Sequence, residues 1–443
     1  MMYKSSFGVE LEFLVAVGLE TEQYSTQEGY ETGHRRGQPV FIPESQCAYD
    51  GVDLCCYKTI QSTIEQHLGI VNPATRVLPP GQPVTDDYES LEGYSKWTVK
   101  PDYSIMLPEN HGILGKFRGY HWVCVEVTSP ALWAAPESFK EVKKVCELLR
   151  TNFLTLITDS CGLHIHWGRG SGWVPVHHLR QAAALLLACD PLLAQLHPES
   201  RKDNYHCLSN RYFSEVAQRT LTAEQVNESL DEEALEPLAF GQRGGRGTEY
   251  AGSSRVFSRR IAAGCLEWYP FKPHQVPVSV EKFHTSLRAP QSTPNTARQL
   301  PICSLPEAVG RLMNSSSKIS ARKLAFNFRN YIPGFYGESD VKRTIEFRQC
   351  AGTLDGEEVA AFAKLFIGLC EFSEKTTIND LWHLILKCAE AEVAAAEWPD
   401  VTGDDVFDIL IEAGLAQEAE ALQTVTLKRQ SKSKVSRDEL AQF

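Results

Sequence analysis

The sequence lacks any stretch of about 18 uninterrupted apolar residues, the length that a membrane-spanning helix needs. Its first residues, MMYKSSFGVELEF, also lack an apolar core of the length found in secretion signals. An excess of positive charge is missing as well, because the formal net charge is -12. We therefore expect no membrane segment, a cytoplasmic location and no binding to the phosphate backbone of nucleic acids.

Cysteine is present, but without the pattern of a disulfide framework. The 13 cysteines are an odd number and are scattered, several of them in apolar stretches. This favours a reduced, intracellular protein. At 443 residues and 43% hydrophobic composition the chain can bury a large core, either as two or three ordinary domains or as one large sheet-based domain with insertions.

Two runs place charged groups at alternate positions among apolar and aromatic residues. The first, FGVELEF at residues 7–13, contains Glu10 and Glu12, and the second, TIEFRQ at residues 344–349, contains Glu346 and Arg348. In an extended chain the two charges of each run share one face. Taken alone, each run also fits an edge strand with a solvated face, whereas buried charges would need a partner such as a divalent cation bound to a polyphosphate.

Two further runs carry groups that can bind a metal. CGLHIHWG at residues 161–168 alternates His164 and His166 with apolar residues, and Val123–Pro130 contains Glu126 within an apolar, β-branched run. A carboxylate in such a run needs a cation or has a raised pKa. In WTVKPDYSI, residues 97–105, Asp102 follows a short strand pattern.

This ordered series resembles the amidoligase family of the glutamine synthetase-like carboxylate-amine ligases, to which glutamate-cysteine ligases also belong. The resemblance also includes KLAFNFRNY at residues 323–331 and TIEFRQCAGTLD, and it extends from residue 7 to about residue 355. It implies an α+β fold with a curved, mainly antiparallel sheet, helices packed on the other side and long loop insertions. It further implies that the concave face binds ATP and two or three Mg²⁺ ions, for which Mn²⁺ can substitute. Tyr103 stands where the family has glycine, and the alternative role of Asp102 is to cap a turn.

The resemblance also assigns roles to individual residues. The implied metal ligands are carboxylates and one imidazole: Glu10, Glu12, Glu126, His164 and Glu346. Arg348 would neutralise the transferred phosphoryl group, and Glu346 and Glu126 are the other implied catalytic residues. The implied nucleotide-binding residues are His164, His166, Lys323, Asn327, Arg329 and Arg348.

The chemistry of such a site is the joining of a carboxylate to an amine. A carboxylate is a poor electrophile until ATP phosphorylates it, and attack of the amine on the acyl phosphate then forms an amide and releases ADP and phosphate. Oxygen ligands suit the Mg²⁺ ions that this transfer requires. The sequence predicts a small-molecule carboxylate and amine as substrates, but it identifies neither of them, nor the oligomeric state.

Two other functions fit parts of the pattern. A zinc hydrolase could use Cys161, His164 and His166 with Glu126, although Cys-x-x-His-x-His lacks the usual ligand spacing on a helix. A non-catalytic nucleotide-binding module could use the same sheet, but it would have no need of the carboxylates.

Composition and periodicity divide the chain into three parts. We predict a catalytic domain over residues 1–375, a helical extension over 376–425 and a disordered tail over 426–443. Helical periodicity is found at 138–158, 176–196, 357–372 and 377–398, with a further pair of short helices in 401–422. Residues 288–306 contain four prolines and are predicted to form a surface linker, and the Gly- and Arg-rich stretch 241–260 could close over phosphates or form a loop.

Overall fold

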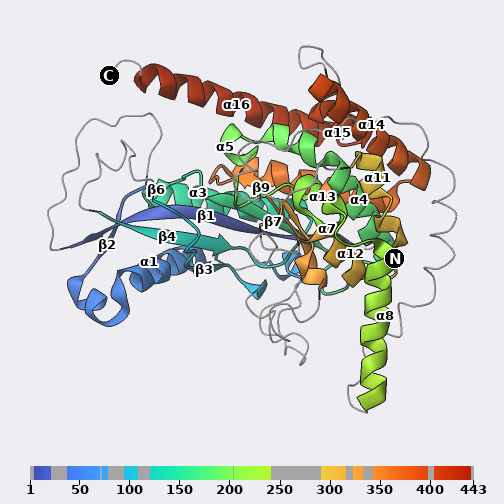
Figure 1. Ribbon diagram of the computed structural model, residues 1–443. Coiled ribbons are helices and arrows are strands. Elements are labelled where there is room, and N and C mark those ends of the chain that lie inside the picture. The colour runs from blue at the N-terminus through green and yellow to red at the C-terminus, as the bar shows by residue number, and fades with distance from the viewer. Residues whose placement is uncertain are drawn as a thin grey trace. The chain divides into compact units, whose positions relative to one another are not determined.

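The computed structural model describes residues 4–20, 37–69, 72–77, 94–107, 120–202, 204–240, 291–315, 323–332, 343–397 and 404–440 (Figure 1). These residues form an α+β fold with a large, mostly antiparallel open sheet, which confirms the predicted fold class. The stretch 241–260 lies outside the described residues, so its role stays a prediction.

In the part of the chain that the structure describes, the sheet has nine strands. Their hydrogen-bonded order is β3-β4-β1-β7-β9-β8, with β2, β5 and β6 also paired to β1. The pairing of β2 with β1 is parallel, whereas β3, β4, β5, β6, β8 and β9 have antiparallel partners. The strands are β1 (Ser6–Leu19), β2 (Val40–Ile42), β3 (Thr98–Lys100), β4 (His121–Thr128), β5 (Leu132–Trp133), β6 (Thr155–Leu156), β7 (Gly162–Gly168), β8 (Phe326–Asn327) and β9 (Thr344–Ala351).

The helices differ widely in length. The long ones are α1 (Glu44–Leu68), α3 (Pro136–Asn152), α4 (Val176–Leu193), α8 (Ala223–Phe240), α13 (Gly356–Lys375), α14 (Ile378–Glu397) and α16 (Ala416–Leu440). The short ones are α5 (Glu199–Lys202), α6 (Asn210–Phe213), α7 (Glu215–Gln218), α11 (Thr293–Ala297), α12 (Pro306–Met313) and α15 (Val406–Glu412). The described residues also form four 3₁₀ turns: η1 (Pro73–Thr75), η3 (Ala194–Leu196), η4 (Leu300–Ile302) and η5 (Arg329–Tyr331).

The chain forms two compact units. The first comprises Met1–His166 and Cys350–Ala363, and the second comprises Trp167–Gln349 and Lys364–Phe443. This division does not test the predicted domains, a catalytic domain over residues 1–375 and a helical extension over 376–425, which stay predictions.

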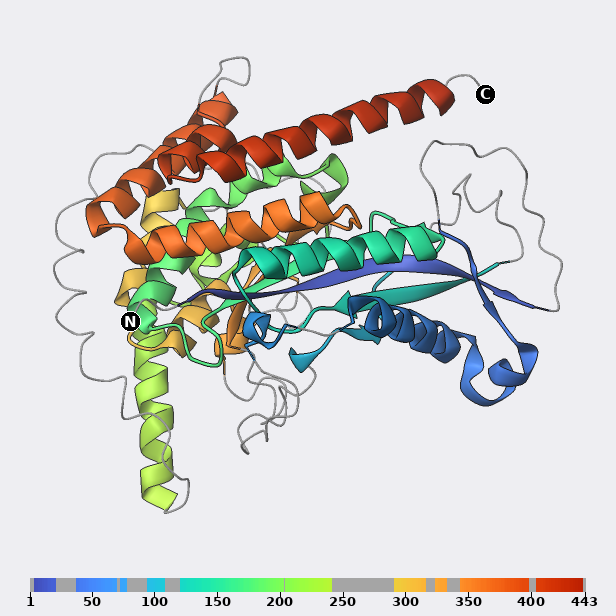
Figure 2. The same ribbon diagram turned by 180° about the vertical axis from the view of Figure 1, so that it is seen from behind.

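Strand β1 organises the first unit because its residues alternate strictly between two faces. Phe7, Leu11 and the other odd-numbered residues form an apolar face, and Phe7 stacks on Phe139 of α3 with ring centroids 4.8 Å apart. Helices α1 and α3 cover this face of the β1–β4 pair (Figure 2). The even-numbered residues, which include Glu10 and Glu12, therefore lie on the opposite face.

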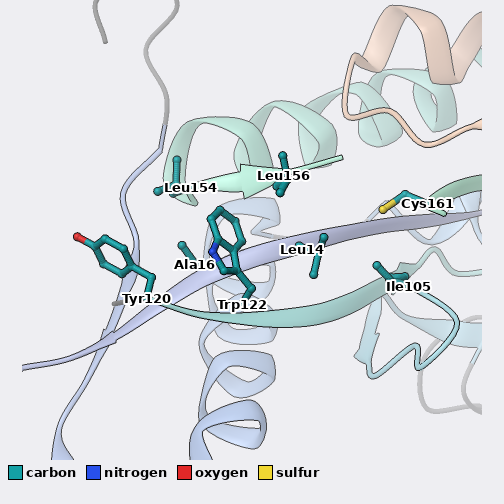
Figure 3. Close-up of a cluster of buried hydrophobic side chains, with 8 residues drawn as sticks. All are labelled: Leu14, Ala16, Ile105, Tyr120, Trp122, Leu154, Leu156 and Cys161. Carbon is teal, nitrogen blue, oxygen red and sulfur yellow. The ribbon is translucent and has the colours of Figure 1, made fainter. Parts of the chain in front are cut away.

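The opposite face is polar at one end and apolar at the other. Toward the end of β1 it carries a buried cluster in which Leu14 and Ala16 pack with Trp122 of β4 (Figure 3). The cluster also contains Ile105, Tyr120, Leu154, Leu156 and Cys161. Strand β1 thus carries Glu10 and Glu12 and, further along the same face, residues of a buried apolar cluster that holds the strand in place.

The second unit is built around helix α4, most of whose residues are buried. It contacts α6, α11, α12 and α14. Inside this unit the carboxylate of Asp190 accepts hydrogen bonds from Ser209 Oγ at 2.7 Å, Arg211 N at 3.0 Å and Gln349 Nε2 at 2.6 Å. Burial raises the pKa of Asp190 to about 6 against these bonds. This network fixes β9, which carries Gln349, to the helices.

Helices are present at the four predicted places, as α3, α4 with η3, α13 and α14. The first is shorter than its predicted range of 138–158, because α3 ends at Asn152 and Thr155–Leu156 form β6. Asp355 caps α13, because its Oδ1 accepts a hydrogen bond from Glu357 N at 3.0 Å. The side chain of Glu358 accepts from Thr353 Oγ1 at 3.1 Å, and the backbone nitrogen of Asp355 donates to the same hydroxyl at 3.1 Å.

Helix α16 extends to Leu440, and the disordered tail predicted from residue 426 belongs to the domain division and stays a prediction. One segment differs from its prediction. The proline-rich stretch predicted as a surface linker contains α11 and η4, in which Thr293, Ala297 and Leu300 are buried. Proline at the first turn of a helix is compatible with both elements. Among the described residues, no helix is long and apolar enough to cross a membrane.

Candidate active site

Five of the predicted site residues lie on the polar face of the first unit. Glu10 and Glu12 come from β1, Glu126 from β4, and His164 and His166 from β7. The antiparallel register pairs Glu12 with Glu126 directly. All five side chains are buried, with at most 9% of each residue exposed. Because alternate residues of a strand share one face, these strands place carboxylates and imidazoles that can bind a metal on the same face, as the sequence predicts.

Glu10 contacts both histidines of β7. Its Oε2 lies 3.2 Å from His164 Nδ1, and its Oε1 lies 3.0 Å from His166 Nε2. The other ring nitrogen of His164, Nε2, lies 3.3 Å from Glu12 Oε1. His164 is thus held between two carboxylates, which fixes the orientation of its ring.

Glu12 is held by the backbone as well. Its Oε2 accepts a hydrogen bond of 2.6 Å from the backbone nitrogen of Gly162. A Cβ atom at position 162 would lie 2.8 Å from His164 Nε2 and 3.3 Å from Glu12 Oε2. Because glycine has no side chain, the imidazole of His164 and the carboxylate of Glu12 can lie close to the backbone at position 162.

Glu126 has two partners that sequence reasoning missed. Lys100 Nζ lies 3.0 Å from Glu126 Oε1, and Thr128 Oγ1 donates a hydrogen bond of 2.9 Å to the same oxygen. Burial and then the charge of Glu10 raise the pKa of Glu126 to about 7, while Lys100 and Thr128 oppose the shift. For Thr128 the sequence carries a signal, because it follows Glu126 by two residues on the same strand, whereas the contact of Lys100 depends on the register between β3 and β4.

Four further predicted residues lie in the second unit, on β8, η5 and β9. The register pairs Asn327 with Glu346, and Asn327 Nδ2 donates a hydrogen bond of 2.9 Å to Glu346 Oε2. Arg348 Nη1 donates to the other oxygen of Glu346. Arg329 is buried, and its backbone nitrogen donates to Asn327 Oδ1 at 2.9 Å. Glu346 and Arg348 thus share one face of β9, as their spacing predicts.

The strand that carries these groups is itself fixed. Arg201 Nη2 donates a hydrogen bond of 2.7 Å to the backbone oxygen of Arg348. Asn210 bonds the backbone of Phe326 in both directions, with Nδ2 to the carbonyl at 2.8 Å and Oδ1 to the amide at 2.7 Å. Buried polar side chains therefore hold β8 and β9 in position.

Three residues named from the sequence stand apart from these groups. Lys323 Nζ lies over the ring of Tyr205, 3.3 Å from its centroid. Asp102 Oδ1 accepts a hydrogen bond of 2.7 Å from Ser104 N, which is the turn-capping role weighed for it. Cys161 packs in the apolar cluster, and burial raises the pKa of its thiol to about 11.

The side chains of the first unit suit a hard divalent cation. They offer three carboxylates and two imidazoles on one buried face, and each carboxylate is held by a hydrogen bond or an ion pair. Mg²⁺ and Mn²⁺ prefer carboxylate oxygens and accept imidazole, whereas structural zinc sites favour thiolates and imidazoles in a closed tetrahedron. Several carboxylates buried together are stable only when cations or protons neutralise them.

A comparison with known families places part of the chain in a described family. A family model described as "Putative amidoligase enzyme" matches residues 4–236. The matched range includes all five residues of the first unit's polar face, and β8 and β9 lie beyond it. No curated protein matches the chain.

Proposed function

Because the chain belongs to the amidoligase family that this model describes, we propose that it is an ATP- and Mg²⁺-dependent carboxylate-amine ligase. The reaction would join the carboxylate of an amino-acid-like molecule to an amine through an acyl phosphate, with release of ADP and phosphate. The observation that carries the proposal is the group of three buried carboxylates and two histidines on one strand face. A cytoplasmic location belongs to the same proposal, because the reaction consumes ATP.

The residues of β1, β4 and β7 would provide the metal site. Glu10, Glu12 and Glu126 would bind Mg²⁺ through their oxygens, and His164 would act as a further ligand or hold Glu10 and Glu12 in place. Two or three bound Mg²⁺ ions would supply charge neutralisation for the β- and γ-phosphates of ATP. His166, bonded to Glu10, would orient that carboxylate or contact a phosphate.

The residues of β8 and β9 would act on the transferred phosphoryl group. Glu346 is the carboxylate proposed as a metal ligand here, and Asn327 and Arg348 fix its two oxygens. The planar guanidinium of Arg348 can hold two oxygens of a phosphoryl group at once, which suits a group on which charge accumulates during transfer. Arg329, Asn327 and Lys323 stay proposed nucleotide-binding residues.

The geometry around Cys161 weighs against a zinc hydrolase. The thiol of Cys161 is buried in the apolar cluster with Leu14 and Ile105. It also accepts a hydrogen bond from Thr158 N at 3.4 Å. We therefore propose no role for Cys161 in catalysis.

The test is a screen of paired amino acids and amines for ADP release, with mass spectrometry of the products. A ligase releases ADP only when ATP, a divalent cation, the carboxylate and the amine are all present. ATP binding without turnover for any pair would favour a non-catalytic nucleotide-binding module. Stoichiometric zinc that survives dialysis, together with hydrolysis that needs no ATP, would contradict the proposal.

A further inference from the structure

Lys100 and Glu126 form an ion pair at the edge of the candidate metal site. They are direct register partners on β3 and β4, and Lys100 Nζ lies 3.0 Å from Glu126 Oε1. Strand β3 is the terminal strand of the sheet order. The lysine thus reaches the site from its rim, whereas the carboxylate belongs to the site itself.

The two partners differ in how firmly they are held. The side chain of Glu126 is 9% exposed and that of Lys100 is 48% exposed. Thr128 Oγ1, from the same strand as Glu126, donates to the oxygen that Lys100 contacts. Glu126 is therefore fixed by its own strand, while the lysine is a half-exposed chain with four flexible carbons.

An ammonium group and a divalent cation compete for such an oxygen. Mg²⁺ binds carboxylate oxygens at about 2.0–2.1 Å, so an ion at Glu126 Oε1 would lie within a few ångströms of Lys100 Nζ. Two cations at that separation in a buried site repel each other strongly. A cation can bind Glu126 fully only when the lysine moves away.

We propose that Lys100 is an exchangeable counter-ion. It neutralises the ionised carboxylate of Glu126 before nucleotide binds. When Mg²⁺ binds Glu126, the lysine side chain moves and its ammonium group pairs with a phosphate oxygen of the nucleotide. This inference rests on the proposed function, because it assigns the lysine a partner in the Mg²⁺-ATP complex. The consequence is that Mg²⁺ and nucleotide bind cooperatively. Mg²⁺ binding frees the ammonium group of Lys100 to bind phosphate, and phosphate binding keeps that ammonium group away from the metal ligand Glu126.

The test compares wild type with Lys100→Met in two binding measurements that need no knowledge of the substrates. Electron paramagnetic resonance measures Mn²⁺ affinity without nucleotide, and calorimetry measures the affinity of AMP-PNP in the presence of Mg²⁺. We expect Lys100→Met to bind Mn²⁺ roughly threefold to tenfold more tightly, because the competing charge is gone. We expect it to bind AMP-PNP about tenfold more weakly, because a charge-assisted bond to phosphate is lost.

The matched control is Lys143→Met. Lys143 is on α3, on the opposite face of the sheet, and pairs with Glu357. This variant should leave both affinities unchanged, and circular dichroism should confirm that both variants fold.

The opposite signs of the two effects separate this role from a structural one. A lysine that only supports the fold would weaken both affinities when removed, and that result would overturn the inference, as would unchanged affinities in Lys100→Met. Tighter Mn²⁺ binding with unchanged AMP-PNP binding would refute the transfer to phosphate. Wild type that binds neither Mn²⁺ nor AMP-PNP would instead overturn the proposed function itself.

Discussion

The carboxylate of Glu12 accepts a hydrogen bond of 2.6 Å from the backbone nitrogen of Gly162, a residue on a different strand. The bond places an acidic side chain of β1 against the start of β7, just where His164 follows. Because the donor is a backbone group, the bond requires β7 to lie close to β1, and a side chain at position 162 would crowd His164 and Glu12.

Gly162→Ala should weaken metal binding. Its methyl group would lie 2.8 Å from His164 Nε2, so the imidazole must turn away from Glu12. We expect the Mn²⁺ dissociation constant to rise by about tenfold, the usual effect of disturbing the groups that orient metal ligands. Gly172→Ala is the control, because its Cβ would meet the carbonyl oxygen of Arg169 at an ordinary 3.5 Å. Equal Mn²⁺ affinities in both variants would show that Glu12 and His164 do not hold the metal.

Glu10→Gln should abolish turnover and leave the fold intact. The change removes the charge that both histidines of β7 face, and an amide oxygen is a poor replacement for a carboxylate that binds Mg²⁺. We expect the Mn²⁺ dissociation constant to rise by about a hundredfold or more. Glu147→Gln, an exposed change on α3, is the control. Near-normal ATP-dependent activity in both Glu10→Gln and Glu12→Gln would remove these residues from the metal site.

The face shared by Glu10 and Glu12 was predictable because the period of a strand is fixed at two residues. The same rule identified His164 with His166 and Glu346 with Arg348. Lys100 was missed, because its contact with Glu126 depends on which strand pairs with β4, and register between distant segments is set by the packed sheet. Thr128 follows Glu126 by two residues on β4, so the same period of two would have found it. The turn made by Asp102 could be anticipated, since a short acidic side chain readily bonds the backbone two residues on.

The proline-rich segment before α12 shows the limit of composition as a guide. Four prolines over residues 288–306 predicted a surface linker, but Thr293 and Leu300 are buried there. Burial of single residues by distant parts of the chain leaves no periodic pattern in the sequence.

Glu126→Gln should stabilise the protein without metal and more so at high pH. The pKa of Glu126 is raised from its usual 4.5 to about 7, so between these values the folded protein keeps a proton that the unfolded chain has lost. The contribution of this group to stability therefore falls as pH rises through that window, and glutamine has no such loss. The melting temperature of the variant minus that of wild type should be near zero at about pH 4.5, rise with pH, and reach a plateau above pH 7.

Added Mn²⁺ should reverse this order. The ion stabilises wild type by binding only the folded state, and the variant lacks one ligand. A difference in melting temperature that does not change with pH would show that Glu126 titrates normally.

Arg348→Lys should lose far more turnover than nucleotide affinity. Arg348 contacts Glu346, and its guanidinium can grip a phosphoryl group with two bonds where lysine offers one point charge. We expect turnover to fall by roughly two orders of magnitude with little change in the affinity for AMP-PNP. Arg311→Lys, which changes an arginine paired with Glu307 on α12, is the control. If turnover were unchanged and the Michaelis constant for ATP were raised, Arg348 would bind ATP before the reaction without stabilising the transferred phosphoryl group, which would contradict the proposed role.

The proposed acyl phosphate predicts the fate of one oxygen atom. When a carboxylate-amine pair that supports ADP release has been found, the carboxylate is labelled with a heavy oxygen isotope and the products are analysed by mass spectrometry. Transfer of the γ-phosphoryl group to the carboxylate, followed by attack of the amine, must give ADP and leave one labelled oxygen in the released phosphate. Label in AMP, with pyrophosphate as the other product, would contradict the mechanism even if the amide forms.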